Sequence, residues 1–219
     1  MTNFFEFLHQ LKQNNNREWF SANKSIYEMA KKEADAIFEL VYAILSEQEA
    51  FHPLKKYRIY RDVRFSLDKT PYKTHFSAFI GRKQPHHRGG FYIHFEPGNC
   101  FIGGGFWGPE KDDLLRIRKA IDASDELETI LNDQKLTSSF GHLKGETLKT
   151  APKGFPKDHE RISLLRMKQY LLIKKFDDHD VLGDDFPQKV LEAYQLLLPF
   201  FHYMTEVLTT NENGEYIYE

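Results

Sequence analysis

Apolar residues recur every three or four positions near both ends of the chain. The first stripe consists of Phe4, Phe7, Leu8 and Leu11, and a longer one runs from Ile26 to Leu45. This spacing is typical of amphipathic helices, so a helix is expected in each segment. The same spacing predicts helices after Pro109, from Ser124, and from Phe186 to Leu208. Pro199 is expected to kink or divide the last of these.

The middle of the chain alternates apolar and polar residues, which indicates strands. The strands are expected at Tyr57–Phe65, Phe76–Ile80, Phe91–Phe95 and Cys100–Gly105, with a further one at 170–176. The first four are joined by connections too short for crossover helices, which favours an antiparallel meander. We therefore predict one α+β domain over residues 1–208: a mainly antiparallel sheet of four or more strands, packed by N- and C-terminal helices. Residues 209–219 are predicted to be a loose tail.

Positive charge is concentrated in one segment. Residues 55–88 contain ten Lys or Arg and only two acids, so they carry +8 although the 219-residue chain has a formal net charge of -2. The other residues therefore sum to -10. Such a local field favours an anionic partner.

The arginines of this segment suggest the chemistry of a binding site. On a strand, Arg58 and Arg64 would share one face, and a guanidinium fork suits two oxygens of a phosphate or carboxylate. Arg61 would lie on the apolar face, where burial demands an acidic partner. The turn that follows would hold Lys69 and Lys73 near the end of the strand. An internal salt-bridge network explains the same residues equally well.

Two histidines are candidates for acid–base chemistry. On the strand that follows, Tyr92, His94 and Glu96 share a face, and His75 ends the basic turn. A histidine beside a carboxylate suits proton transfer, although a hydrogen-bonded strand face is the commoner arrangement. The hairpin from Tyr92 to Trp107 is expected to roof the basic segment, with these two aromatic residues as ligand contacts.

Several other signals are weaker. Gly103, Gly105 and Gly108 have the spacing of a dinucleotide fingerprint, but no βαβ unit surrounds them and Pro109 removes a helix N–H, so we predict no such cofactor. The acidic run at 177–180 and the pair at 86–87 lack metal-ligand spacing, and no metal is predicted. A single cysteine, Cys100, is expected to be a buried, inert thiol. No signal peptide or apolar span is evident, so a soluble, cytoplasmic protein is expected.

The stretch "YRIYRDVRFSLDKTPYKTH" resembles the signature of an uncharacterised family of conserved hypothetical proteins, a domain of unknown function. The resemblance extends to "NNNREWFSANKSIYE", "YIHFEPGN", "GPEKDDLLRIRKAI" and "PKGFPKDHERISLLRMK", and so covers residues 4–208. Leu67 departs from the family pattern, which has a polar or basic residue there. The resemblance implies one intact domain and no particular activity.

Three functions remain open. The first is binding of a phosphate-bearing or carboxylate ligand at the Arg58–Lys73 segment. That ligand could be nucleic acid, because Tyr57, Tyr60, Phe65, Tyr72 and Phe76 interleave with the basic residues and could stack bases. The second is an enzyme acting on a small phosphorylated substrate, with His94 or His75 as the base. The third is a scaffold that docks an acidic protein.

Overall fold

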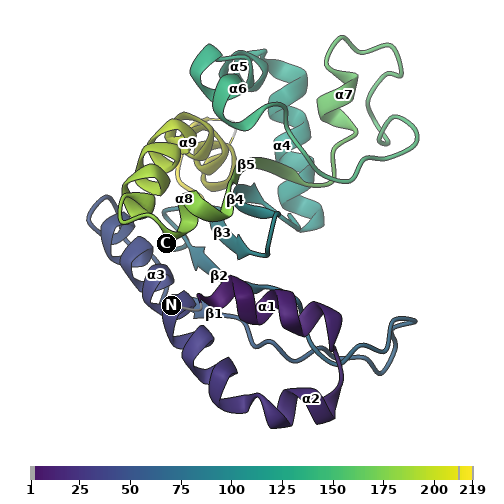
Figure 1. Cartoon of the computed structure of the whole chain (residues 1–219). Helices are drawn as coiled ribbons and strands as arrows, with labels where there is room; N and C mark the ends of the chain where they lie inside the picture. The colour runs from purple at the N-terminus through teal and green to yellow at the C-terminus, as the bar shows by residue number, and fades with distance from the viewer. Residues whose placement is uncertain (1–2, 212, 219) are drawn as a thin grey trace. The chain divides into compact units, whose positions relative to one another are not determined.

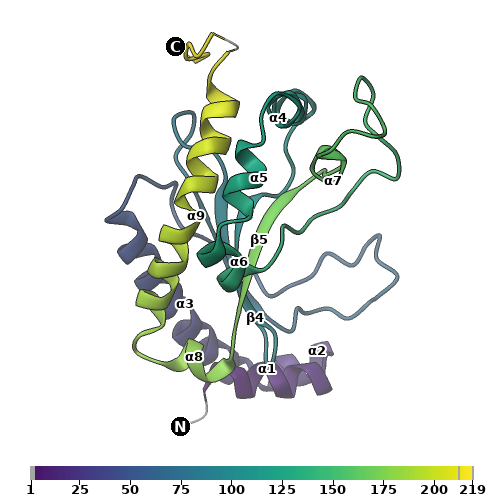
Figure 2. The same cartoon turned by 90° about the horizontal axis from the view of Figure 1, so that it is seen from above.

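The fold consists of a five-stranded antiparallel sheet, with helices before it, between its last two strands, and after it in the chain (Figures 1 and 2). The computed structural model describes residues 3–211 and 213–218. The strands are β1 (Lys55–Lys56), β2 (Phe76–Gly81), β3 (Gly90–Phe95), β4 (Cys100–Phe106) and β5 (Tyr170–Phe176), and they neighbour one another in that order. The predicted α+β class and antiparallel sheet are confirmed.

The helices follow the apolar stripes. Helices α1 (Phe4–Gln13), α2 (Arg17–Ala22) and α3 (Lys24–Ser46) precede the sheet, and α4 (Lys111–Ala123), α5 (Glu126–Leu131), α6 (Gln134–Phe140) and α7 (Ile162–Leu165) separate β4 from β5. Helices α8 (Asp178–Leu182) and α9 (Phe186–Thr209) follow β5. Asparagines begin the first two helices: the Asn3 side chain accepts hydrogen bonds from two backbone N–H groups, and Asn16 accepts one.

Two local predictions are wrong. The segment Tyr57–Phe65 is an irregular loop, in which only Tyr60 forms a β-bridge, to Tyr72. Its supposed apolar face is not a buried face, because the Phe65 side chain is fully solvent-exposed. Of the two outcomes predicted for Pro199, division of the last helix is wrong, since α9 is continuous from Phe186 to Thr209, and the kink stays a prediction.

The chain forms two compact units, each assembled from three separate segments. The first unit comprises residues 1–80, 92–102 and 175–191, and the second comprises 81–91, 103–174 and 192–219. Strands β2 to β5 and helix α9 each contribute residues to both units. The predicted boundary at residue 208 stays a prediction. Of the predicted tail, residues 212 and 219 lie outside the described residues, and Thr210 forms a β-bridge with Tyr216.

Aromatic side chains fill the core of the first unit. Helix α1 packs on α3, and the Phe38 ring of α3 stacks on Phe95 of β3 at 4.6 Å between centroids. Phe76 of β2 contacts the rings of Phe4 and Phe7. The apolar stripes of the N-terminal helices are therefore the surface on which these strands pack.

The core of the second unit is built against glycines of β4. A Cβ atom at Gly104 would lie 2.3 Å from a Leu197 methyl group and 3.3 Å from the Phe201 ring, and one at Gly105 would lie 2.1 Å from the Tyr170 carbonyl oxygen. Gly105 also has a φ of 142°, which favours glycine. Helix α9 and strand β5 thus approach β4 at distances that a side chain would prevent.

Among the described residues, no helix is long and apolar enough to cross a membrane.

Candidate functional site

The segment between β1 and β2 is a long loop of the first unit, and Figure 1 shows it projecting to the right beside α1. Its two ends are tied together by backbone hydrogen bonds, including one of 2.8 Å from Lys73 N–H to the Ile59 carbonyl. The Asn15 side chain accepts a bond from Tyr72 N–H at 3.1 Å and donates one to the Tyr72 carbonyl at 2.9 Å. The Phe20 ring stacks on Tyr72 at 4.0 Å. The position of Lys73 is therefore fixed by the N-terminal helices.

Two of the predicted arginines already have carboxylate partners. Arg61 bonds to Asp68 and to the Thr70 hydroxyl, and Arg64 bonds to Asp62 at 2.7 and 3.0 Å. Backbone and hydroxyl bonds from Thr70, together with Arg61, lower the pKa of Asp68 to about 2. The acidic partner predicted for Arg61 is confirmed, and its side chain, predicted to be mostly buried, is 26% exposed.

Two other predicted ligand contacts, Lys69 and Trp107, have separate surroundings. Lys69 is exposed and its ammonium donates to the backbone carbonyl of Val63 at 3.0 Å. Trp107 is 72% exposed and belongs to the second unit. Their role in ligand binding stays a prediction.

Two lysine ammonium groups lie near one tyrosine ring, and Arg58 is close enough to repel one of them. The Lys55 and Lys73 ammonium groups lie 5.3 and 5.4 Å from the centre of the Tyr57 ring. Burial, together with repulsion from Arg58, lowers the pKa of Lys73. Among the described residues, no carboxylate lies within ion-pair distance of Lys55, Arg58 or Lys73. By contrast, the neighbouring Lys56 pairs with two acids of α3.

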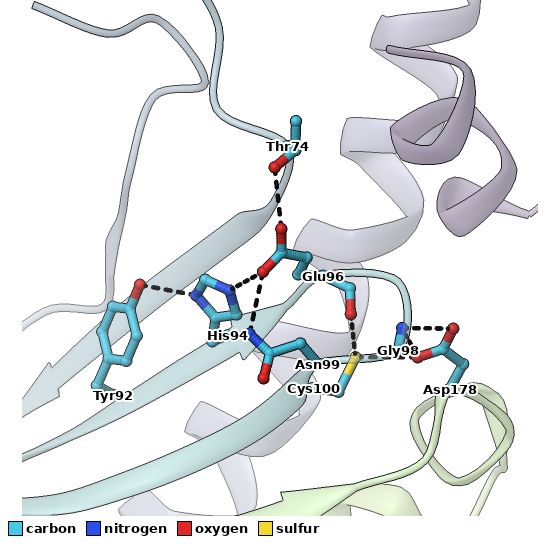
Figure 3. A network of polar contacts seen from close by, with 8 residues as sticks. All are labelled: Thr74, Tyr92, His94, Glu96, Gly98, Asn99, Cys100 and Asp178. Atoms are coloured by element: carbon cyan, nitrogen blue, oxygen red, sulfur yellow. Dashed lines mark hydrogen bonds and ion pairs between the residues drawn. The ribbon is translucent and has the colours of Figure 1, made fainter. Parts of the chain in front are cut away.

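A chain of hydrogen bonds links Tyr92, His94 and Glu96 along β3 and just past its end (Figure 3). The Tyr92 hydroxyl lies 3.1 Å from His94 Nδ1, and His94 Nε2 lies 3.4 Å from Glu96 Oε2. Thr74 and Asn99 each donate to Glu96 at 3.0 Å. Although burial alone would raise the pKa of Glu96, the bonds from Asn99, Thr74 and His94 lower it. Glu96 is therefore an ionised acceptor on which the other groups converge.

The two candidate bases, His75 and His94, lie next to each other. Its ring centre is 4.1 Å from that of His94, which is buried and also stacks on Phe101 at 4.6 Å. Burial, followed by the charges of His94 and Lys73, lowers the pKa of His75 to about 4, with Glu96 acting in the opposite direction. Burial likewise lowers the pKa of His94. Both imidazoles are therefore neutral near pH 7.

The turn after β3 is fixed by Asp178 of α8. Its carboxylate accepts the Gly98 N–H at 2.9 and 3.1 Å, and the Cys100 thiol contacts it at 3.5 Å (Figure 3). Burial raises the pKa of Cys100 to about 12. The thiol is buried, as predicted, and the neutral form is the stable one at physiological pH.

The weaker signals of the sequence serve the fold. Gly105 belongs to the packed face of β4 and meets the Tyr170 backbone. In the acidic run at 177–180, Asp178 binds the Gly98 turn and Asp180 bonds to Lys189 at 2.7 Å. Across residues 3–211 and 213–218, no three His, Cys, Asp or Glu side chains gather as a metal site would require.

The structure thus brings together Lys73, His75, Tyr92 and His94 of the predicted set, with Arg58 close enough to repel Lys73. Sequence reasoning left out Lys55 and Tyr57 as site residues. The sequence around Lys55 and Lys56 is the same for both, and the acids that pair with Lys56 come from α3. Only the structure separates these two adjacent lysines.

These features define an α+β protein with two adjacent neutral histidines, near three cations that form no ion pair within the part of the chain that the structure describes. The family comparison agrees with the sequence resemblance: a family model described as "Conserved hypothetical protein (DUF2461)" matches residues 3–203. The chain belongs to this family. Neither the curated proteins nor the solved structures gave a match.

Proposed function

We propose that the protein binds an anionic ligand, bearing a phosphate or carboxylate group, at the cluster of Lys55, Arg58 and Lys73. The observation that carries this proposal is the contrast in pairing within one basic segment. Lys56, Arg61 and Arg64 each have a carboxylate within ion-pair distance, whereas none of the three cations of the cluster does among the described residues. The Arg58 charge does act on Asp62, but Arg64 already binds that carboxylate.

The cost of this arrangement supports the proposal. Lys73 is partly buried beside Arg58, and both effects disfavour its charged form. A bound anion would remove the repulsion and replace the lost hydration with charge-assisted hydrogen bonds.

Arg61 and Arg64 remain in the predicted set, but each already has an acid partner, so we expect them to contribute less than Arg58. The sequence led us to expect a clamp of Arg58 and Arg64 on a regular strand. The proposed site keeps Arg58 but has Lys55 and Lys73 in place of Arg64.

A nucleic-acid ligand remains within this proposal. Tyr57, Tyr60 and Phe65 are 37%, 41% and 97% exposed and could stack on bases, whereas Tyr72 and Phe76 are buried. Comparing inorganic phosphate, a mononucleotide and a single-stranded oligonucleotide would show whether stacking adds to binding.

The test uses two matched pairs of variants. At low salt, phosphate-bearing ligands should raise the melting temperature of the wild-type protein, because a ligand that binds only the folded state stabilises it. Lys55→Met and Arg58→Met should abolish most of this increase. Lys56→Met and Arg64→Met remove the same charges from paired positions and should retain it. Equal losses in all four variants, or no shift with any ligand in the wild type, would reject the cluster as a binding site.

A further inference from the structure

Of the two stacked histidines, His94 and His75, only His75 has ring nitrogens that take no hydrogen bond among the described residues. It is half-buried, and its ring lies against His94 at 4.1 Å. Neither nitrogen of His75 is a buried atom without a partner, so the unbonded ring nitrogens reach solvent. They are therefore accessible to a ligand bound beside Lys73.

His94 cannot take that role without breaking its own contacts. Since Glu96 is ionised and only accepts, His94 Nε2 carries the proton, and Nδ1 accepts from the Tyr92 hydroxyl. Ser77 also bonds to the Tyr92 oxygen. Both nitrogens of His94 are thus occupied, and its ring serves as a fixed support for His75.

The charges that face His75 come from two segments. Lys73 lies two residues before it, and His94 and Glu96 lie on β3. Lys73 disfavours a protonated His75 and Glu96 favours it. A bound anion would offset the effect of Lys73 and add its own attraction to that of Glu96, against the burial and the His94 charge that lower the pKa of His75.

We propose that His75 contacts the bound anion and takes up a proton when the anion binds, so that binding of the ligand and binding of a proton are coupled. The proposal rests on the anion-binding function above and adds the residue and the proton. Because the pKa of His75 is about 4 without a ligand, its ring is neutral near pH 7 and can accept a proton when the anion binds.

The same geometry indicates which anions fit best. Two lysines, an arginine and an imidazolium offer more positive charge than a phosphodiester, with its single negative charge, can satisfy. A terminal phosphate carries up to two negative charges and three oxygens that accept these donors. We therefore expect inorganic oxyanions and phosphate monoesters to bind more tightly than phosphodiesters.

Sulfate is the appropriate probe, because it keeps two negative charges throughout the range from about pH 8 to about pH 5, where histidine titrates. Its binding to the wild-type protein should be measured by calorimetry at constant low ionic strength. The affinity should rise as the pH falls, by at most about tenfold per pH unit, the limit for uptake of one proton. At a pH near 6, the binding enthalpy should also differ between two buffers of different ionisation enthalpy.

His75→Gln should flatten the pH dependence and remove the buffer dependence, while His9→Gln, an exposed histidine of α1 bonded to Gln13, should change neither. The buffer comparison on the wild type needs no variant, so it decides even where His75→Gln fails to fold. Sulfate binding with the same enthalpy in both buffers, or a pH dependence that survives in His75→Gln, would overturn the proton coupling alone. No sulfate binding at any pH would overturn the proposed function with it.

Discussion

The histidine pair illustrates how a single residue acquires its chemistry from its neighbours. His94 and His75 are both histidines, with ring centres 4.1 Å apart. Tyr92 and Glu96 form hydrogen bonds with His94, whereas the His75 ring has none among the described residues. Sequence reasoning could nominate both as bases but could not rank them. The ranking depends on which side chains reach each ring. His94 has Tyr92 and Glu96 on either side of it along β3, whereas His75 directly precedes β2 and has no such partners in the part of the chain that the structure describes.

At the same scale, the depressed pKa of His75 predicts an acid-dependent loss of stability. The folded ring binds its proton near pH 4, while the ordinary value is 6.5. Between these values the unfolded chain binds more protons, so stability falls as the pH drops from about 6.5 to about 4. His75→Gln should therefore reduce the slope of unfolding free energy against pH in this window, measured by urea unfolding without added anions. Part of the slope should remain because the pKa of His94 is lowered too.

The matched control for this measurement is His9→Gln, whose side chain is exposed on α1. It should leave the slope unchanged. A slope that is identical in the wild type and in His75→Gln would show that the folded protein protonates His75 as readily as the unfolded chain does.

Among the elements, the loop between β1 and β2 is where the sequence misled most. Alternation in Tyr57–Phe65 predicted a strand, but alternation says nothing about a partner strand. Arg61 and Arg64 instead satisfy their charges within the loop, with Asp68 and Asp62. Short-range pairing of this kind competes with a regular ladder. The strands β2, β3 and β4 were predictable because their apolar residues also meet the buried stripes of helices.

Two phenylalanines, one in this loop and one in the strand that follows it, should contribute very differently to stability. Phe65 is 97% exposed, so Phe65→Ala should change the unfolding free energy by about 0.5 kcal/mol or less. Phe76 of β2 is 5% exposed and contacts Phe4, Phe7 and Tyr27, so Phe76→Ala should cost about 3–5 kcal/mol. Chemical denaturation of both variants measures the difference. A large loss in Phe65→Ala would mean that the loop packs against the protein in solution.

Strand β4 offers a second matched comparison, between two glycines. Gly105→Ala would place a Cβ atom 2.1 Å from the Tyr170 carbonyl oxygen at a φ of 142°, and should cost at least about 2 kcal/mol. Gly103→Ala would meet only ordinary contacts, at 3.8 and 3.9 Å, and should lie within about 1 kcal/mol of wild type. Equilibrium unfolding separates the two. If Gly103→Ala proved the more damaging, the glycines of β4 would have another role than close packing.

For the whole molecule, charge and architecture were predictable to different degrees. The uneven charge follows from counting residues, whereas the identity of the cations left without an acid depends on tertiary contacts, as Lys55 and Lys56 demonstrate. The α+β class follows from the order of stripes and alternating segments. The division into two compact units has no mark in the sequence, because no linker or change in composition separates them.

The last prediction concerns how these units unfold. Neither is a continuous piece of chain, and strands β2 to β5 and helix α9 each supply residues to both. Unfolding one unit would interrupt the hydrogen bonds of strands that the other also uses, so we expect a single cooperative transition.

The two tryptophans allow a direct test, since Trp19 lies in the first unit and Trp107 in the second. In a Trp107→Phe background, Trp19 fluorescence reports on the first unit alone. Phe200→Leu, a change in the buried core of the second unit, should then lower the midpoint of the Trp19 signal by roughly 2–4 °C for each 1 kcal/mol of destabilisation. Phe38→Leu in the core of the first unit is the positive control. A Trp19 midpoint that responds to Phe38→Leu and ignores Phe200→Leu would mean that the two units unfold independently.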